Sequence, residues 1–233
     1  MELKYIIIIA AVAFLLLVIV GLSIVNYSSE DLLDKFKQTA RYSIGVTPNE
    51  FARLINSIHF NNNIKIKYKD GLFVDSFNGN GTLTLSTNYA NDYNMAAVAI
   101  CAHELGHAFQ YKDKSQMMRS HTKKIILSKS ICGFTTPLIV GGIVAIILGQ
   151  IYLGIGLVCS GALTFLIAVI TKLSTLKIES GASKKALELL SVYANFTDDE
   201  LKLAKAFLNS AKQTYLAELL RIVLKWTFLV KKR

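Results

Sequence analysis

Three uncharged hydrophobic runs stand out along the chain, and each has the length of a membrane span. They cover residues 5–25, 131–149 and 151–170, and a single glutamine separates the last two. Because an α-helix rises 1.5 Å per residue, about twenty residues cross the roughly 30 Å hydrocarbon core of a bilayer. The pattern predicts an N-terminal transmembrane anchor at residues 1–25 and a transmembrane hairpin at residues 131–170.

Each of these runs has an alternative interpretation that the sequence disfavours. The first run is too long for a cleaved signal peptide, and no Ala-x-Ala cleavage site follows it. The other two runs could form the buried hairpin of a soluble protein, but two uncharged runs of about twenty residues match bilayer thickness better. The glycines of the hairpin predict a close approach of its helices (Gly141, Gly142, Gly154, Gly156, Gly161).

Between the first and second runs, apolar and polar residues alternate over short distances, and this pattern predicts a helix and a small sheet. The sequence Thr47-Pro48-Asn49-Glu50 is a capping box with proline at the first helical position. Strict alternation at residues 64–68 predicts a strand, and residues 72–74 and 82–86 predict two more. We expect an antiparallel three-stranded meander. Its last strand either offers an edge to an extended substrate or lies inside the sheet.

The expected sheet leads into an alanine-rich run, residues 95–111, which contains the sequence H-E-L-G-H at residues 103–107. If this run is helical, His103 and His107 lie one turn apart on one face and can bind the same metal ion, with Glu104 beside them. This is the H-E-x-x-H arrangement of zinc peptidases. A chance occurrence of the short pattern is the alternative.

A catalytic zinc ion needs a third protein ligand and keeps one position open. Glu179 is the best candidate, because it lies on a stretch with helical apolar spacing, residues 172–190, that closely follows the hairpin. Glu188 lies about two and a half turns further on the same stretch, and either residue can be a plain surface carboxylate. His59 and His121 are weaker candidates, because isolated histidines more often lie at helix ends or on the surface.

The distribution of charge orients the hairpin. The chain has 26 Lys and Arg against 16 Asp and Glu, and basic residues flank both ends of the hairpin but not its tip. The positive-inside rule therefore predicts a multi-pass protein of the cell membrane with the H-E-x-x-H helix facing the cytoplasm. Anionic lipid headgroups account for the net charge of +10. We do not expect nucleic acid as a partner, because the basic residues flank membrane spans.

The three cysteines do not form a disulfide framework (Cys101, Cys132, Cys159). Only Cys101 lies near the two histidines of the motif, which excludes a Cys-rich structural zinc site. We expect it to be a packing residue.

Several segments together resemble the YugP-like family of neutral zinc metallopeptidases of bacterial membranes. They are C-A-H-E-L-G-H-A-F-Q at residues 101–110, the intervening hairpin, E-S-G-A-S-K-K-A-L at residues 179–187 and A-K-Q-T-Y at residues 211–215. The similarity runs from about residue 46 to residue 215.

This resemblance implies a membrane-bound, zinc-dependent metalloendopeptidase. It implies His103, His107 and Glu179 as the ligands of one zinc ion per chain and Glu104 as the catalytic base. Such an enzyme hydrolyses peptide bonds of a protein or peptide substrate through a zinc-activated water. Its oxyanion partner is left open among four tyrosines (Tyr89, Tyr93, Tyr111, Tyr215).

The expected fold is therefore a mostly helical α+β membrane protein. A cytoplasmic part at residues 26–130 carries the sheet and the H-E-x-x-H helix. A second cytoplasmic part at residues 171–233 carries the third ligand and a C-terminal helix lying along the membrane interface.

Two other functions are weighed against the peptidase. HtpX-like membrane quality-control proteases have an aspartate that orients a ligand histidine, where this chain has Ser183. A catalytically inactive zinc-binding membrane scaffold would need a fourth protein ligand, and the sequence offers no good candidate.

Overall fold

The computed structural model describes residues 30–113 and 133–224 with residues 118, 120, 123, 124, 126, 127, 130 and 131; the side chains of residues 172, 173 and 213–224 are not described. The predicted N-terminal anchor, His121 and the end of the predicted interfacial helix lie outside these residues. The chain forms two compact units. We call residues 31–123 and 175–212 the sheet unit, and the remainder, which contains residues 124–174, the hairpin unit.

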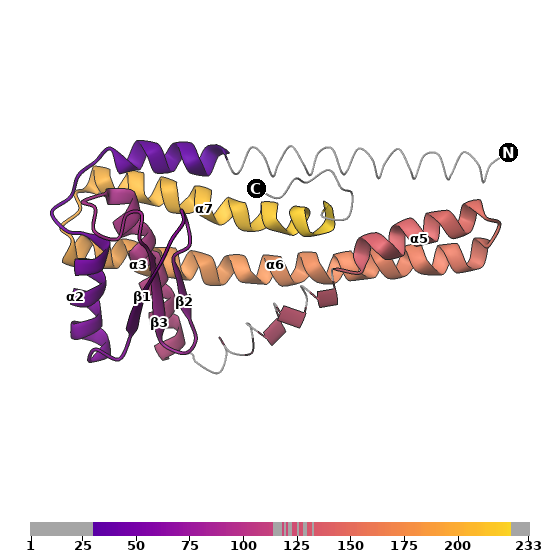
Figure 1. Cartoon of the computed structure of the whole chain (residues 1–233), viewed down its shortest axis with the longest axis horizontal. Helices are drawn as coiled ribbons and strands as arrows, with labels where there is room; N and C mark the ends of the chain where they lie inside the picture. Colours follow the sequence, from indigo (N-terminus) through magenta and orange to yellow (C-terminus); the bar gives the residue numbers. More distant parts are fainter. Residues whose placement is uncertain are drawn as a thin grey trace. The chain divides into compact units, whose positions relative to one another are not determined.

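The hairpin unit contains α5 (Thr135–Ile147) and the first part of α6 (Ile151–Tyr193), which run side by side (Figure 1). A Cβ atom on Gly142 would lie 2.7 Å from the carbonyl oxygen of Gly154, so the two backbones touch at these glycines. Gly161 lies similarly close to the backbone of Thr135. The predicted close approach is thus present at three of the five glycines, whereas Gly141 and Gly156 have no neighbour within 4 Å.

Large apolar side chains remain exposed on this hairpin. Tyr152 is 92% exposed, Leu148 74% and Ile147 69%, and no charged residue lies between them. Among the described residues, α6 is the one helix that is long and apolar enough to cross a membrane, and α5 is an apolar helix of 13 residues. Membrane crossing by both arms of the hairpin stays a prediction.

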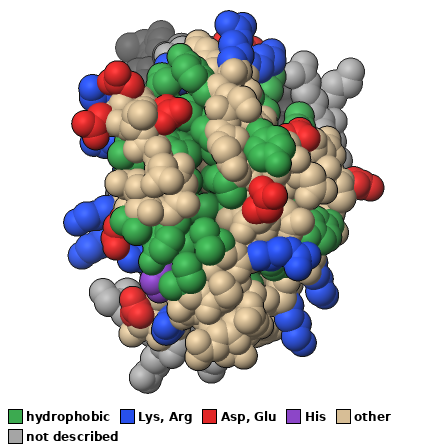
Figure 2. All heavy atoms as spheres, turned by 90° about the vertical axis from the view of Figure 1, so that its left-hand side faces the viewer, with side chains coloured by type: hydrophobic (Ala, Val, Ile, Leu, Met, Phe, Trp, Pro, Cys, Tyr) green, Lys and Arg blue, Asp and Glu red, His purple; other side chains and the backbone are tan. Residues whose placement is uncertain are grey.

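The face drawn in Figure 2 has a different surface. Apolar side chains lie there among both acidic and basic side chains. Such mixing is normal for a surface that faces water. The hairpin differs from this face in having no charged residue among its exposed apolar side chains.

Helices of the sheet unit begin at the capping residues that the sequence contains. α2 (Pro48–Phe60) starts at Thr47, whose hydroxyl accepts a hydrogen bond from the Glu50 N–H while the Glu50 carboxylate accepts one from the Thr47 N–H. This confirms the predicted capping box. α7 (Asp198–Leu224) begins with the same reciprocal pair, made by Thr197 and Glu200.

The sheet is mixed, and the predicted antiparallel meander is wrong. Its strands are β1 (Lys65–Lys69), β2 (Ser76–Asn78) and β3 (Thr82–Ser86), in the spatial order β1-β3-β2. β3 pairs in parallel with β1 and antiparallel with β2. β3 is therefore an interior strand, which is one of the two alternatives that the sequence left open, and the edge strands are β1 and β2.

The backbone after β1 explains this topology. The predicted strand at residues 72–74 is absent, because Gly71 has φ +125° and Phe73 has φ +56°, both outside the β region. The chain turns there, and the Phe73 ring packs edge-on against Phe36 with 5.1 Å between ring centroids. Residues 70–81 separate β1 from β3. This length lets the chain return so that β3 pairs in parallel with β1.

The sheet unit is held together by α3 (Met95–Asp113), whose apolar face is fully buried. Its neighbours in the core come from α2, β3, the end of α6 and α7 (Phe51, Ile55, Leu83, Leu85, Leu189, Leu190, Phe207). The Asn94 side chain caps the helix by accepting a hydrogen bond from the Ala97 N–H at 3.2 Å. The predicted helix at residues 172–190 is present, but it is continuous with the apolar run as part of the 43-residue α6.

The backbones of α3 and α6 touch at Gly106. A Cβ atom on Gly106 would lie 2.4 Å from the carbonyl oxygen of Ala182 and 3.0 Å from its Cα. These are backbone atoms, which no side-chain rotation can move away. Glycine at residue 106 therefore sets the distance between the helix that carries the two motif histidines and the helix that carries Glu179.

Gly106→Ala is expected to lower the free energy of unfolding of the chain by about 1–3 kcal/mol, because the added methyl group forces α3 and α6 apart. Urea denaturation of the purified full-length chain measures this. Gly45→Ala is the matched control, because a Cβ atom there meets no heavy atom within 4 Å. Equal stabilities of the two variants would contradict the close helix contact.

Candidate metal centre

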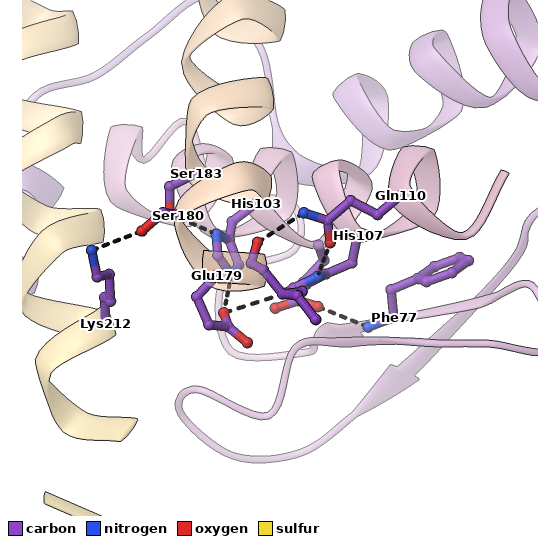
Figure 3. Close-up of polar contacts among 10 residues, drawn as sticks. Phe77, His103, His107, Gln110, Glu179, Ser180, Ser183 and Lys212 are labelled. Atoms are coloured by element: carbon purple, nitrogen blue, oxygen red, sulfur yellow. Dashed lines mark hydrogen bonds and ion pairs between the residues drawn. The ribbon is translucent and has the colours of Figure 1, made fainter. Parts of the chain in front are cut away.

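Three side chains from α3 and α6 meet in the sheet unit (Figure 3). The Oε2 atom of Glu179 lies 3.2 Å from Nε2 of His103 and 3.4 Å from Nε2 of His107. The imidazole rings are 4.8 Å apart between centroids and nearly perpendicular. All three side chains are nearly buried, with 10–13% of their surface exposed.

This geometry fits a zinc ion. Ligand atoms about 2.1 Å from a tetrahedral zinc ion lie about 3.4 Å from one another, close to the separations between Glu179 and each histidine. The three ligand atoms lie within 4.8 Å of one another, and two imidazoles with one carboxylate are a common ligand set for catalytic zinc. The residues present therefore suit the metal that the H-E-x-x-H pattern predicts.

Electrostatics within the cluster favour the charged forms of Glu179 and His107. Burial alone would raise the pKa of Glu179, but hydrogen bonds from His103 and His107 lower it to about 2. Burial opposes the protonation of His107, yet the carboxylates of Glu179 and Glu104 raise its pKa to about 9. Without a metal ion, a proton on the imidazole thus compensates the carboxylate.

The Nδ1 atoms of both histidines have partners that direct their Nε2 atoms toward Glu179. Nδ1 of His103 lies 3.2 Å from the Ser183 hydroxyl. Nδ1 of His107 lies 3.0 Å from Oε1 of Gln110. Such partners fix the orientation of a metal-binding imidazole. No role for Gln110 is predicted from the sequence, although its position three residues after His107 places both on one helix face.

Glu104 lies beside the cluster and is held by β2. Its Oε2 accepts a hydrogen bond of 2.8 Å from the Phe77 N–H. Burial raises the pKa of Glu104, while the two histidines oppose that rise. Because Phe77 is opposite Leu83 of β3 and yet donates to Glu104, its N–H points out of the sheet edge. The outer edge of β2 therefore faces the cluster.

The loop before β2 is fixed by Asp75. Its carboxylate accepts hydrogen bonds from the Ser86 N–H at 3.0 Å and from the Tyr89 hydroxyl. Burial raises the pKa of Asp75. These contacts tie the start of β2 to β3 and so help to position Phe77.

The other candidate ligands lie elsewhere. Nε2 of His59 lies 2.7 Å from the Tyr193 hydroxyl, and its ring packs against Phe109. Glu188 pairs with Lys185 on the surface of α6. The Cys101 thiol is buried and donates to the Pro48 carbonyl, in agreement with a packing role.

The four tyrosines that the sequence offers as oxyanion partners lie in different environments. The Tyr89 hydroxyl is engaged by Asp75, Tyr93 is 54% exposed, and the side chain of Tyr215 lies outside the described residues. The Tyr111 ring packs against the ring of Phe77, whose backbone N–H binds Glu104, with 5.8 Å between ring centroids.

Comparison with known proteins identifies a family of zinc peptidases. The profile of a family described as "Putative neutral zinc metallopeptidase" matches residues 6–231. The chain is also 26% identical over 221 residues to the "Putative membrane protease YugP" of Bacillus subtilis (strain 168), which covers 91% of this chain and 95% of that protein. No solved structure matches the chain.

Proposed function

Because the chain belongs to the family of putative neutral zinc metallopeptidases, we propose that it is a membrane-bound zinc metalloendopeptidase. The carrying observation is the convergence of His103, His107 and Glu179 at the spacing of zinc ligands, with Glu104 beside them. These three residues would hold one zinc ion. The fit of the donor set and its near burial support this assignment.

The chemistry divides between the metal and Glu104. When bound, zinc acts as a Lewis acid that polarises a peptide carbonyl and lowers the pKa of a water molecule. Glu104 takes a proton from the attacking water and passes it to the leaving amine. Its raised pKa suits both roles, because the carboxylate then holds the transferred proton more readily.

An extended peptide suits the surroundings of Glu104. β2 is the end strand of the sheet, and its outer edge faces the metal cluster. A peptide lying along this edge would form hydrogen bonds with backbone groups of β2 other than the Phe77 N–H, which Glu104 binds, and would present a carbonyl to the metal. The proposed substrates are therefore proteins or peptides in an extended conformation.

The proposed attachment to a membrane rests on the hairpin unit. Exposed apolar side chains on α5 and the first part of α6, without charges among them, would lie in lipid. The relative from Bacillus subtilis is named a membrane protease. We further propose the predicted division of the chain, with an anchor at residues 1–25 and both ends of the hairpin at the cytoplasmic face.

Glu104→Gln is expected to keep about one zinc ion per chain and to lower peptide hydrolysis by about 10²–10⁴-fold, because it removes the base and leaves the ligands in place. Zinc content by mass spectrometry and cleavage of an unfolded protein substrate measure the two effects. Glu188→Gln, on the exposed surface of α6, is the matched control. Undiminished cleavage by the Glu104 variant would eliminate the enzyme assignment. A wild-type chain that binds zinc without cleaving would favour the scaffold.

Glu179→Ala is expected to weaken zinc binding by more than about 100-fold, since it removes a direct ligand and the loss of an outer partner already costs about 10–100-fold. Zinc affinity is measured by competition with a chromophoric chelator. Glu188→Ala should bind zinc as tightly as the wild type. Wild-type affinity in the Glu179 variant would disqualify it as the third ligand.

A cysteine at the hairpin tip tests the membrane orientation. Gln150→Cys is expected to react with a membrane-impermeant maleimide in intact cells, whereas Lys184→Cys should react only after permeabilisation. The wild-type chain, with its own three cysteines, gives the background. Labelling of the Lys184 variant in intact cells would reverse the proposed topology.

A further inference from the structure

Gln110 lies between the two helices that build the metal centre and has no role in the chemistry described above. Its side chain leaves α3 one turn after Gly106 and reaches α6 (Figure 3). Oε1 faces Nδ1 of His107 at 3.0 Å, and Nε2 donates to the carbonyl oxygen of Ile178 at 2.8 Å. Both polar ends of one amide are thus engaged.

The direction of this amide is fixed by chemistry. A backbone carbonyl can only accept a hydrogen bond, so the NH₂ group of Gln110 must face Ile178. The amide oxygen then faces His107, and because that oxygen can only accept, Nδ1 of His107 must carry the hydrogen. The neutral imidazole is left with its lone pair on Nε2, the atom directed at Glu179.

Neither Ser183 nor any other described partner fixes a tautomer in this way. A serine hydroxyl can donate or accept, so its contact with Nδ1 of His103 is compatible with either tautomer. Among the described residues, only Gln110 links a backbone carbonyl of α6, that of Ile178, to the orientation and tautomer of His107 on α3.

Space for this amide comes from Gly181. A Cβ atom there would lie 2.8 Å from Nε2 of Gln110 and would obstruct its approach to Ile178. The bond to Ile178 also ends on the residue directly before Glu179. Gln110 therefore couples the position of the third proposed ligand to the orientation of the second.

We infer that Gln110 is a positioning residue of the metal centre, which sets the Nε2-accepting tautomer of His107 and holds Glu179 in register with it. The inference rests on the proposed zinc site. Gln110 therefore acts on the affinity of the site for zinc, and any effect on catalysis results from that change in affinity.

Two substitutions separate this role from packing. Gln110→Met keeps the length of the side chain but removes both polar atoms, and it is expected to weaken zinc binding by about 10–100-fold. Gln110→Glu keeps an acceptor oxygen for Nδ1 of His107 but loses the donor to the Ile178 carbonyl, and it is expected to weaken zinc binding less than Gln110→Met does. Gln38→Met makes the same change at an exposed helical position and should not alter affinity.

Zinc affinity of the full-length chain is measured by competition with a chromophoric chelator, and the visible spectrum of the Co²⁺ form reports the ligand geometry. Thermal unfolding of the metal-free variants verifies that each is folded. Wild-type affinity and an unchanged Co²⁺ spectrum in a folded Gln110→Met chain would overturn the inference. Equal weakening in Gln110→Met and Gln110→Glu would also overturn it. A wild-type chain that binds no zinc would instead refute the proposed function.

Discussion

The candidate site depends on the contact of two helix backbones at Gly106 and Ala182. With no side chain between them, α3 and α6 lie close enough for the short side chain of Glu179 to reach both imidazoles. The same proximity lets Gln110 reach the backbone of the facing helix. A side chain at residue 106 would separate all of these partners together, because helices in a packed core move as rigid elements.

Much of this arrangement follows from local sequence signals. The capping box at Thr47 marks the start of α2, because the hydroxyl and carboxylate satisfy backbone groups of their own turn. The spacing of His103 and His107 places both on one helix face, as the structure shows. These features need only neighbouring residues, which is why sequence alone predicts them.

Features that depend on distant partners were less accessible. β1 pairs in parallel with β3, and the predicted strand at residues 72–74 is replaced by a left-handed turn at Phe73, a residue whose type favours a strand and whose ring instead packs on Phe36. Likewise, spacing alone left Glu188 open beside Glu179, and only the crossing of α6 over α3 places one of them at the histidines. For Gln110 the sequence offers only its spacing of three residues from His107, because its partner on α6 is a backbone atom.

Backbone atoms recur as the partners of this site. Glu104 is bound by the N–H of Phe77, Gln110 by the carbonyl of Ile178, and Gly106 rests on the main chain of Ala182. A substitution of a side chain at residue 178 cannot delete the carbonyl that Gln110 uses. Substitutions at residues 77, 178 and 182 would therefore leave the backbone half of these three contacts in place. Substitutions at Glu104, Gly106 or Gln110 of α3 would remove the other half.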